Sequence, residues 1–315
     1  MKPIIIITGP TGSGKTDFSL EVARAVSGEI INADMGQMFS PLTIGTAKPA
    51  WRQESIPHHL FDNITEPEAY SAASYRKDVQ ALVDEIESRG HIPVIVGGSG
   101  FYLQALLWRF KESPILETTV TDYNDVETSA LWEILKDKDP MRANEIHEND
   151  RYRITRALKM LDHGMLPSSH KPEFDPIRPF IIINVVRSTD DLDARILSRL
   201  DAMLQSGWVE EVQELNDAWK SFVYEKKIIG YNTIIDYLNK KIHFAEMKEL
   251  IFFATKHYAK RQRTFWRGLK RKIQESLDSH PQSHGQIYEY DLTLSDHTLY
   301  INQLIDRFNA WNYNE

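Results

Sequence analysis

Continuous apolar runs alternate with amphipathic segments over the first hundred residues. Three apolar runs predict buried strands at residues 4–8, 29–32 and 92–96, and a shorter segment at 58–62 predicts a fourth. Between the strands, apolar side chains recur at three- and four-residue steps, which predicts helices at residues 15–26 and 71–89. This alternation of strands and helices predicts an α/β fold with a parallel sheet flanked by helices.

Two segments then interrupt the pattern. Residues 113–130 are rich in Thr, Asp and Glu and show little periodicity, and residues 163–179 contain four prolines, so both are predicted linkers. Helical patterns lie between them at residues 131–136 and 152–161. We therefore predict a small helical insertion over residues 113–176.

The core resumes after the insertion. Residues 180–186 form another apolar strand pattern, and a last strand is predicted at 287–292. The remaining helices are predicted at residues 190–206, 208–219, 228–239, 244–273 and 297–311. The prediction is a core domain made of residues 1–112 and 177–315.

Composition limits the protein class. Hydrophobic residues make up 42% of the 315-residue chain and charged residues 26%, values typical of a globular protein. No apolar run is long enough to span a membrane, and nothing resembles a signal peptide. The absence of cysteine excludes disulfides, cysteine-based zinc sites and thiol nucleophiles. We therefore expect a cytoplasmic protein without a membrane partner, and we expect it to be a monomer.

The strongest chemical signal is a phosphate-binding loop between the first strand and the first helix. It has the pattern G-x-x-x-x-G-K-[ST] in the strand–loop–helix context that this motif requires. Its residues are Gly9, Pro10, Thr11, Gly12, Ser13, Gly14, Lys15 and Thr16. The glycines allow backbone N–H groups to surround an anion, Lys15 adds a positive charge, and the Thr16 hydroxyl can bind Mg²⁺. The loop predicts a bound di- or triphosphate without deciding which one.

Several polar residues follow other strands. Asp34 comes directly after the second strand, where ligands of parallel sheets bind, so it fits a base or a metal ligand as well as a turn or cap carboxylate. Ser99 follows the strand at 92–96 and is more typical of a helix cap than of a ligand contact. Residues 45–49 bring a cation and a hydroxyl to this region, although a solvated surface loop explains them better. His58 and His59 are adjacent on a strand and point to opposite faces, which makes a metal chelate unfavourable.

A basic stripe is predicted on the helix at 244–273. Residues 256–272 contain eight Lys or Arg and no acid, although the whole chain has a net charge of −8. Five of these residues fall within an arc of about 80° on a helix. They are Lys256, Lys260, Arg263, Arg267 and Lys270. The unmixed sign favours a polyanion partner over a solvated face.

Taken in order, these motifs resemble the tRNA dimethylallyltransferases, also called tRNA isopentenyltransferases. The resemblance covers residues 3–270. Its most specific segments read Ala-Asp, Ile-Gly-Thr-Ala-Lys-Pro, His-His-Leu-Phe-Asp and Tyr-Ala-Lys-Arg-Gln. The matching segments are 9–16, 31–37, 44–49, 57–62, 69–72, 96–102, 139–158, 229–231 and 254–267.

The resemblance implies transfer of a dimethylallyl group from dimethylallyl diphosphate to N6 of adenosine 37 in tRNA, which gives N6-isopentenyladenosine. The phosphate-binding loop then holds the diphosphate leaving group, with Lys15 neutralising its charge and Mg²⁺ on Thr16. Asp34 matches the general base that takes a proton from the adenine amine. Lys227 matches a position that carries a diphosphate-binding arginine in some members.

The resemblance also implies residues that contact tRNA. Ser99 matches a position, usually threonine, that contacts the tRNA, and residues 152–156 match an RNA-contacting segment of the insertion. The complete implied set is Asp34, Met35, Gly36, Gln37, Ser99, Tyr152, Arg153, Ile154, Thr155, Arg156, Lys256, Lys260 and Arg263. Three features depart from the family: Met35 replaces a serine, Glu148 replaces a proline, and the insertion lacks a helix around residues 113–130.

Other functions share parts of this pattern. A P-loop kinase of a nucleoside or small metabolite has the same core, but it usually needs an acid at the end of a neighbouring strand, and residues 92–96 are followed by glycines. A prenyltransferase acting on free AMP has little use for the basic stripe. A noncatalytic RNA-binding relative does not need Lys15, Thr16 and Asp34 intact.

Overall fold

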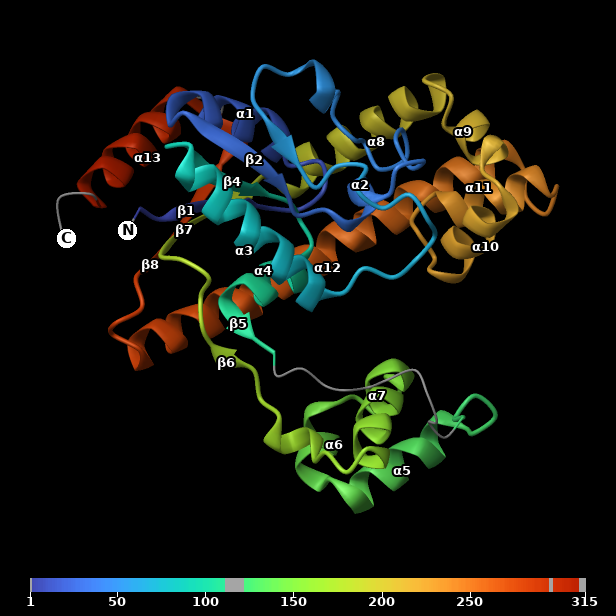
Figure 1. Cartoon of the computed structure of the whole chain (residues 1–315). Helices are drawn as coiled ribbons and strands as arrows, with labels where there is room; N and C mark the ends of the chain where they lie inside the picture. Colours follow the sequence, from blue (N-terminus) through green and yellow to red (C-terminus); the bar gives the residue numbers. More distant parts are fainter. Residues whose placement is uncertain (1, 111–121, 295–296, 312–315) are drawn as a thin grey trace. The chain divides into compact units, whose positions relative to one another are not determined.

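The computed structural model describes residues 2–110, 122–294 and 297–311, so residues 113–121 of the predicted linker lie outside the described part. The chain divides into two compact units, each described by itself below (Figure 1). Unit 1 comprises Met1–Leu107 and Pro176–Glu315, and unit 2 comprises Trp108–Asp175. The insertion expected at 113–176 overlaps most of unit 2.

Unit 1 contains a six-stranded sheet in which each neighbouring pair of strands is parallel. Its strands are β1 (Ile4–Thr8), β2 (Gly28–Asn32), β3 (His58–His59), β4 (Ile92–Val96), β7 (Phe180–Val186) and β8 (Gly285–Asp291). Their order is β3-β2-β4-β1-β7-β8, which places β1 in the interior of the sheet with all five residues buried. The predicted α/β class is confirmed, and β1, β4 and β7 have the predicted bounds.

Helices cover both faces of the sheet (Figure 1). The helices of unit 1 are α1 (Lys15–Ala25), α2 (Met35–Met38), α3 (Ala72–Ser88), α4 (Gly100–Leu107), α8 (Thr189–Gln205), α9 (Trp208–Glu214), α10 (Asp217–Glu225), α11 (Tyr231–Leu238), α12 (Phe244–Ser279) and α13 (His297–Trp311), with 3₁₀ turns η1 (Trp51–Gln53) and η3 (Leu292–Leu294). Phe18 of α1 and Leu304 of α13 pack with Ile5 and Ile7 in one apolar cluster on one face. Because side chains alternate along a strand, Ile4 and Ile6 face the other side, along which α3, α4 and α12 lie (Figure 1).

Several predicted elements of unit 1 are wrong in detail. The helix expected over 244–273 extends to Ser279, the helix expected over 228–239 begins at Tyr231, and the strand expected over 287–292 runs from Gly285 to Asp291. The strand expected over residues 58–62 ends at His59, because Leu60 and Asp62 have φ angles of 60° and 54°, outside the extended region. The helix expected over 208–219 is two helices, because the side chain of Asn216 accepts a hydrogen bond from the N–H of Trp219 and caps a new helix there.

Unit 2 is mostly helical. It contains α5 (Thr128–Lys138), α6 (Pro140–Glu145), α7 (Arg151–Asp162), the turn η2 (Pro167–Ser169) and the short antiparallel pair β5 (Trp108–Arg109) and β6 (Glu173–Phe174). Leu131, Leu135, Ile154 and Leu158 form its apolar core. Helix α6 was not predicted, and the segment expected as a linker at 163–179 contains η2 and β6.

Candidate active site

The phosphate-binding loop joins β1 to α1, as its sequence predicts. Gly14 caps α1 with a φ of 87°, a conformation that strongly favours glycine. A Cβ atom on Gly9 would lie 2.5 Å from the carbonyl oxygen of Val185, so this part of the loop passes too close to β7 for any side chain. The N-terminus of α1 therefore opens into a loop whose path depends on its glycines.

Long-range contacts hold this loop from outside. The N–H of Thr11 donates to Oε1 of Gln262 at 2.8 Å, and Nε2 of Gln262 donates to the Gly98 carbonyl at 3.0 Å. Gln262 is the last residue of the Tyr-Ala-Lys-Arg-Gln segment on α12, so one side chain links the loop to the turn after β4. Two arginines bind carbonyls of the same loop: Nε of Arg187 donates to Ser13 at 2.7 Å, and Nε of Arg195 donates to Gly12 at 2.9 Å.

A pocket lies beside the loop. Lys15, Thr16, Asp34 and Arg199 are among the residues that line it. Burial lowers the pKa of Lys15 to about 8; the charge of Asp34 acts against this shift, and Arg199 acts with it. Burial also lowers the pKa of Arg199, again against the effect of Asp34. The pocket therefore brings two incompletely neutralised cations near one carboxylate, a combination suited to an incoming anion.

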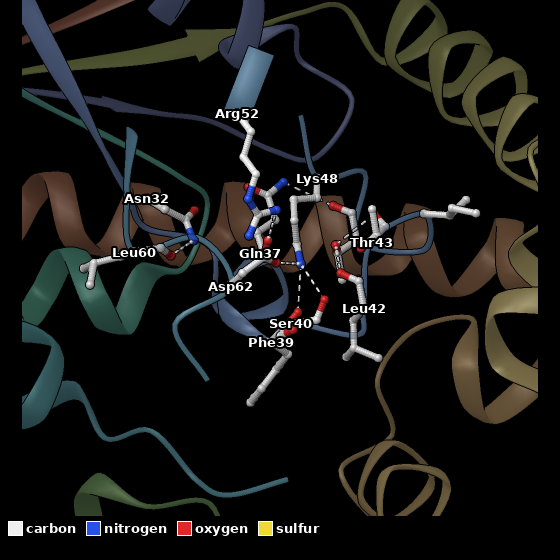
Figure 2. Close-up of polar contacts among 12 residues, drawn as sticks. Asn32, Gln37, Phe39, Ser40, Leu42, Thr43, Lys48, Arg52, Leu60 and Asp62 are labelled. Carbon is white, nitrogen blue, oxygen red and sulfur yellow. Dashed lines mark hydrogen bonds and ion pairs between the residues drawn. The ribbon is translucent and has the colours of Figure 1, made fainter. Parts of the chain in front are cut away.

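Asp34 is oriented by its neighbours at the end of β2. Its Oδ1 accepts the N–H of Gly36 at 3.1 Å, which caps α2. Its own N–H donates to the amide oxygen of the buried Asn32 at 2.9 Å. The side-chain nitrogen of Asn32 donates to the Leu60 carbonyl at 3.0 Å, as Figure 2 shows. Asp34 therefore caps a helix, which is one of the roles that its place in the sequence allows, and it also lines the pocket.

The residues after Asp34 take different roles. Met35 is 42% exposed, and its backbone N–H donates to Oγ of Ser99 at 3.2 Å. Ser99 thus joins the beginning of α4 to the residue after Asp34. Gln37 lines the pocket, and its amide donates to the carbonyls of Thr46 and Ala47 at 3.2 Å each.

Lys48 corrects the interpretation of residues 45–49 as a solvated loop. Its side chain is only 2% exposed and donates to the carbonyls of Phe39 and Ser40 and to Asp62 (Figure 2). Arg52 completes the cluster with an ion pair to Asp62 at 2.7 Å. The family-like segments 44–49 and 57–62 therefore meet through a buried ion pair that organises the loop.

The predicted diphosphate contact of Lys227 is not supported by its position. Lys227 is exposed after α10, with a φ of 51°, and it is not among the residues that line the pocket. The cation that lines the pocket beside Lys15 is Arg199 on α8, which the sequence analysis missed. The sequence feature that could have identified Arg199 is its place in the helix after strand β7, because the carboxyl end of β7 lies beside the phosphate-binding loop.

The predicted tRNA-binding residues on α12 differ in their surroundings. Lys256 forms an ion pair with Asp193 of α8 at 2.6 Å, and Lys270 pairs with Glu289 of β8. Arg263 donates to Oγ1 of Thr189 at 3.2 Å. Lys260 is exposed and has no ion pair within the described residues. The stripe is therefore partly an ion-pair network and partly open to a partner.

The predicted tRNA-binding residues on α7 also divide by exposure. Tyr152 is 73% exposed, and Arg153 and Arg156 are exposed as well, whereas Thr155 is half-buried. Ile154 is fully buried in the core of unit 2, which corrects its assignment as an RNA contact. The helical period explains this, since Ile154 lies three and four residues before the buried Ala157 and Leu158 and so shares their face of α7.

Two further observations concern metal and membrane. His59 contacts Glu29 at 2.7 Å and His58 contacts the Ile56 carbonyl at 2.7 Å, so the two rings have separate partners. No group of three or more His, Asp or Glu residues suited to a metal ion occurs in the described ranges. Among the helices described, none is both long enough and apolar enough to cross a bilayer.

Comparison with known proteins identifies the family of this chain. The family described as IPP transferase matches residues 37–269. A tRNA dimethylallyltransferase from Caldanaerobacter subterraneus subsp. tengcongensis is 33% identical over 91% of this chain and 96% of its own length. One from Thermotoga petrophila is 36% identical over 87% and 92%, respectively.

Two solved structures share the fold. A tRNA delta(2)-isopentenylpyrophosphate transferase from Staphylococcus epidermidis is 26% identical with a TM-score of 0.63, covering 98% of this chain and 99% of the other. A eukaryotic dimethylallyltransferase acting on tRNA gives a TM-score of 0.76 at 26% identity, covering 93% and 74%. Because the family match covers most of the sequence and the relatives align over nearly their full length, this chain belongs to the IPP transferase family.

Proposed function

We propose that this enzyme transfers a dimethylallyl group from dimethylallyl diphosphate to N6 of adenosine 37 in tRNA. The observation that carries the proposal is the shared pocket of Lys15, Arg199 and Asp34, which combines cations for a leaving diphosphate with a carboxylate for a proton. The same pocket is also lined by apolar residues, which are Leu20, Ile30, Ala47, Pro49, Phe61 and Val96. A prenyl diphosphate needs both kinds of surface.

The residues divide the reaction between them. Backbone N–H groups of the phosphate-binding loop and the N-terminus of α1 hold the diphosphate, and Lys15 neutralises its charge as the bond from carbon to oxygen breaks. The adenine N6 forms a bond to that carbon and loses a proton to Asp34. The products are the prenylated base, diphosphate and a protonated Asp34, so the step is balanced.

Magnesium fits the site through Thr16. Thr16 is an exposed residue in the first turn of α1 and lines the pocket, and Mg²⁺ commonly takes few protein ligands together with phosphate oxygens and water. When bound there, Mg²⁺ would supply additional positive charge to the leaving diphosphate.

Basic residues at the surface support a tRNA partner. Arg153 and Arg156 are exposed on unit 2, and on α12 of unit 1 Lys260 is exposed and Arg263 is half-buried. We assign them to contacts with the tRNA backbone, which carries one negative charge per nucleotide. The target base has to leave its stack to reach Asp34.

A transfer assay tests the proposal against the other activities. Incubation of the protein with Mg²⁺, labelled dimethylallyl diphosphate and unmodified tRNA is expected to label adenosine 37 without ATP. A matched tRNA with guanosine at position 37 should remain unlabelled. Labelling of free AMP instead of tRNA, or consumption of ATP with a metabolite acceptor, would replace the proposal with one of the alternatives.

A further inference from the structure

Glu211 of α9 makes an unusual set of contacts outside the pocket. Its Oε2 accepts the N–H groups of Thr43 at 3.0 Å and Ile44 at 2.6 Å. Its Oε1 accepts the N–H of Gly45 at 3.3 Å and the hydroxyl of Tyr231 at 2.6 Å. Three consecutive backbone N–H groups thus converge on one carboxylate, as they would on a bound anion.

The loop that Glu211 holds is closely packed. Residues 43–47, here called the 43–47 loop, are closed by the Thr46 hydroxyl, which donates to the Leu42 carbonyl at 2.6 Å. Trp208 of α9 lies directly against the loop: a Cβ atom on Gly45 would be 2.1 Å from its indole nitrogen, and one on Gly230 would be 2.0 Å from its ring. The family-like segment 229–231 therefore serves this contact, with Gly230 admitting the indole and Tyr231 binding Glu211.

The other side of the 43–47 loop meets the catalytic segment. The side chain of Gln37 donates to the carbonyls of Thr46 and Ala47. Gly36 also lies close to the loop, since a Cβ atom added to it would be 3.0 Å from the methyl group of Thr46. The N–H of Gly36 in turn donates to Oδ1 of Asp34. A continuous series of contacts joins Glu211 to the carboxylate of Asp34.

We propose that Glu211 is a positioning residue for Asp34, acting through the 43–47 loop and the first turn of α2. Charge-assisted hydrogen bonds to the three N–H groups fix the loop, and the loop fixes Gln37 and Gly36. The direction of the Asp34 carboxylate toward the reacting amine depends on this support. The inference rests on the proposed prenyl transfer, in which Asp34 takes the proton.

The role has a specific kinetic signature. A misdirected base lowers kcat, whereas the phosphate-binding loop is held separately by Gln262, Arg187 and Arg195. Glu211→Gln keeps the shape of the side chain but puts an amide nitrogen, a donor, where N–H groups need an acceptor. We expect kcat for tRNA prenylation to fall about 10- to 100-fold, the scale of a small misplacement of a catalytic group, with the KM for dimethylallyl diphosphate changed less than about twofold.

The decisive measurement is a double-mutant cycle in single-turnover assays. In the Asp34→Asn background, Glu211→Gln is expected to cause almost no further loss, because its effect passes through the missing carboxylate. An equal loss in both backgrounds overturns the proposal, as does a raised KM with an unchanged kcat. Glu214→Gln, an exposed glutamate on the same helix, is the matched control and should match the wild-type protein.

A milder variant keeps the test valid if Glu211→Gln does not fold. Tyr231→Phe removes one of the four donors to Glu211 and should lower kcat about 3- to 10-fold with the same coupling to Asp34. A Tyr231→Phe enzyme with wild-type kcat would overturn the proposal. Absence of tRNA labelling by the wild-type protein itself would instead refute the proposed function, so the two failures are distinguishable.

Discussion

Strand β2 has a carboxylate near each end, and the two have opposite surroundings. Glu29, the second residue of the strand, is 1% exposed and contacts Arg89 at 2.7 Å, His59 at 2.7 Å and His91 at 2.6 Å. Burial alone would raise the pKa of Glu29, but the hydrogen bonds from these three side chains lower it to about 2. Asp34, two residues beyond the strand, is half-buried, and the hydrogen bond described for its side chain is the one from Gly36.

The difference follows from the two ends of a parallel strand. Ligands bind at the carboxyl ends, where loops diverge and leave side chains open, while the amino ends are closed by the preceding elements. Glu29 accepts hydrogen bonds from three fixed side chains and is therefore expected to stabilise the fold, whereas Asp34 lines the pocket in which we propose that it acts as the base. A perturbed pKa alone would have pointed to Glu29, which lies outside the pocket, since a network of fixed cations also shifts a pKa.

The largest effect is expected from Asp34→Asn, which tests the functional half of this comparison. The substitution keeps the shape of the side chain and removes its basicity, so kcat should fall by about 10²–10⁴, the usual range for a general base. Affinity for tRNA should change little, as measured by filter binding. A mutant within a few-fold of wild type would make Asp34 a cap and nothing more.

Lys15 provides the next test, because its charge depends on pH. Burial lowers the pKa of Lys15 to about 8, so the free enzyme loses this cation as the pH rises through that value. At a fixed tRNA concentration well below its KM, so that the free enzyme predominates, kcat/KM for dimethylallyl diphosphate should fall above pH 8 by up to about tenfold per pH unit. Lys15→Arg should remove this limb, since a guanidinium stays protonated, even where the rate is lower throughout. Persistence of the limb in Lys15→Arg would assign it to another group.

Glu29→Gln tests the structural half of the comparison. It leaves three donors around a neutral amide, and we expect the free energy of unfolding at pH 7 to fall by about 2–4 kcal/mol. Because the folded-state pKa lies below the usual 4.5, the contribution of Glu29 is complete above 4.5 and is lost as the pH falls toward 2. Urea titrations should therefore show a smaller difference from wild type at pH 3 than at pH 7.

The matched control for Glu29→Gln is Glu85→Gln, because Glu85 is an exposed ion-pair partner of Arg89, the arginine that also binds Glu29. It should cost less than about 1 kcal/mol, as is usual for a surface ion pair. Both variants should keep wild-type kcat at temperatures where they are folded. A large loss of kcat in a folded Glu29→Gln protein would contradict the division between the two carboxylates.

The sequence predicted what depends on neighbours along the chain. Strand β1, the phosphate-binding loop and α13 are local patterns of apolar spacing and glycine, and their predicted bounds agree closely with the structure. Asp34 was selected by its position after a strand, although position alone left a cap equally acceptable, and the structure gives it both a cap bond and a place in the pocket.

What the sequence could not predict depends on distant partners. Glu211 and its neighbour Glu210 are indistinguishable in sequence, and only the fold brings one of them to Thr43, 168 residues away. Gln262 meets Thr11 across 251 residues, and Lys256 meets Asp193 from another helix. Pairing of charges is a tertiary property, so a stripe of cations on one helix does not reveal which members are already neutralised.

The smallest effects are expected for substitutions of basic residues on α12, measured as changes in tRNA binding. Here the comparison is between a cation paired within the protein and cations without such a pair. Each phosphate contact contributes about −0.7 to −0.9 to the log–log dependence of tRNA affinity on salt. Lys260→Ala and Arg263→Ala should each flatten this slope by about one unit. Lys256→Ala should leave the slope unchanged, because its ammonium group already binds Asp193 at 2.6 Å.

Titration of tRNA at several salt concentrations measures the slopes of all three variants, with diphosphate binding as the control that the core is intact. If all three variants keep the wild-type slope, the whole stripe is structural, like Glu29. If Lys256→Ala flattens the slope, a lysine that is paired with Asp193 in the free protein still contacts the tRNA.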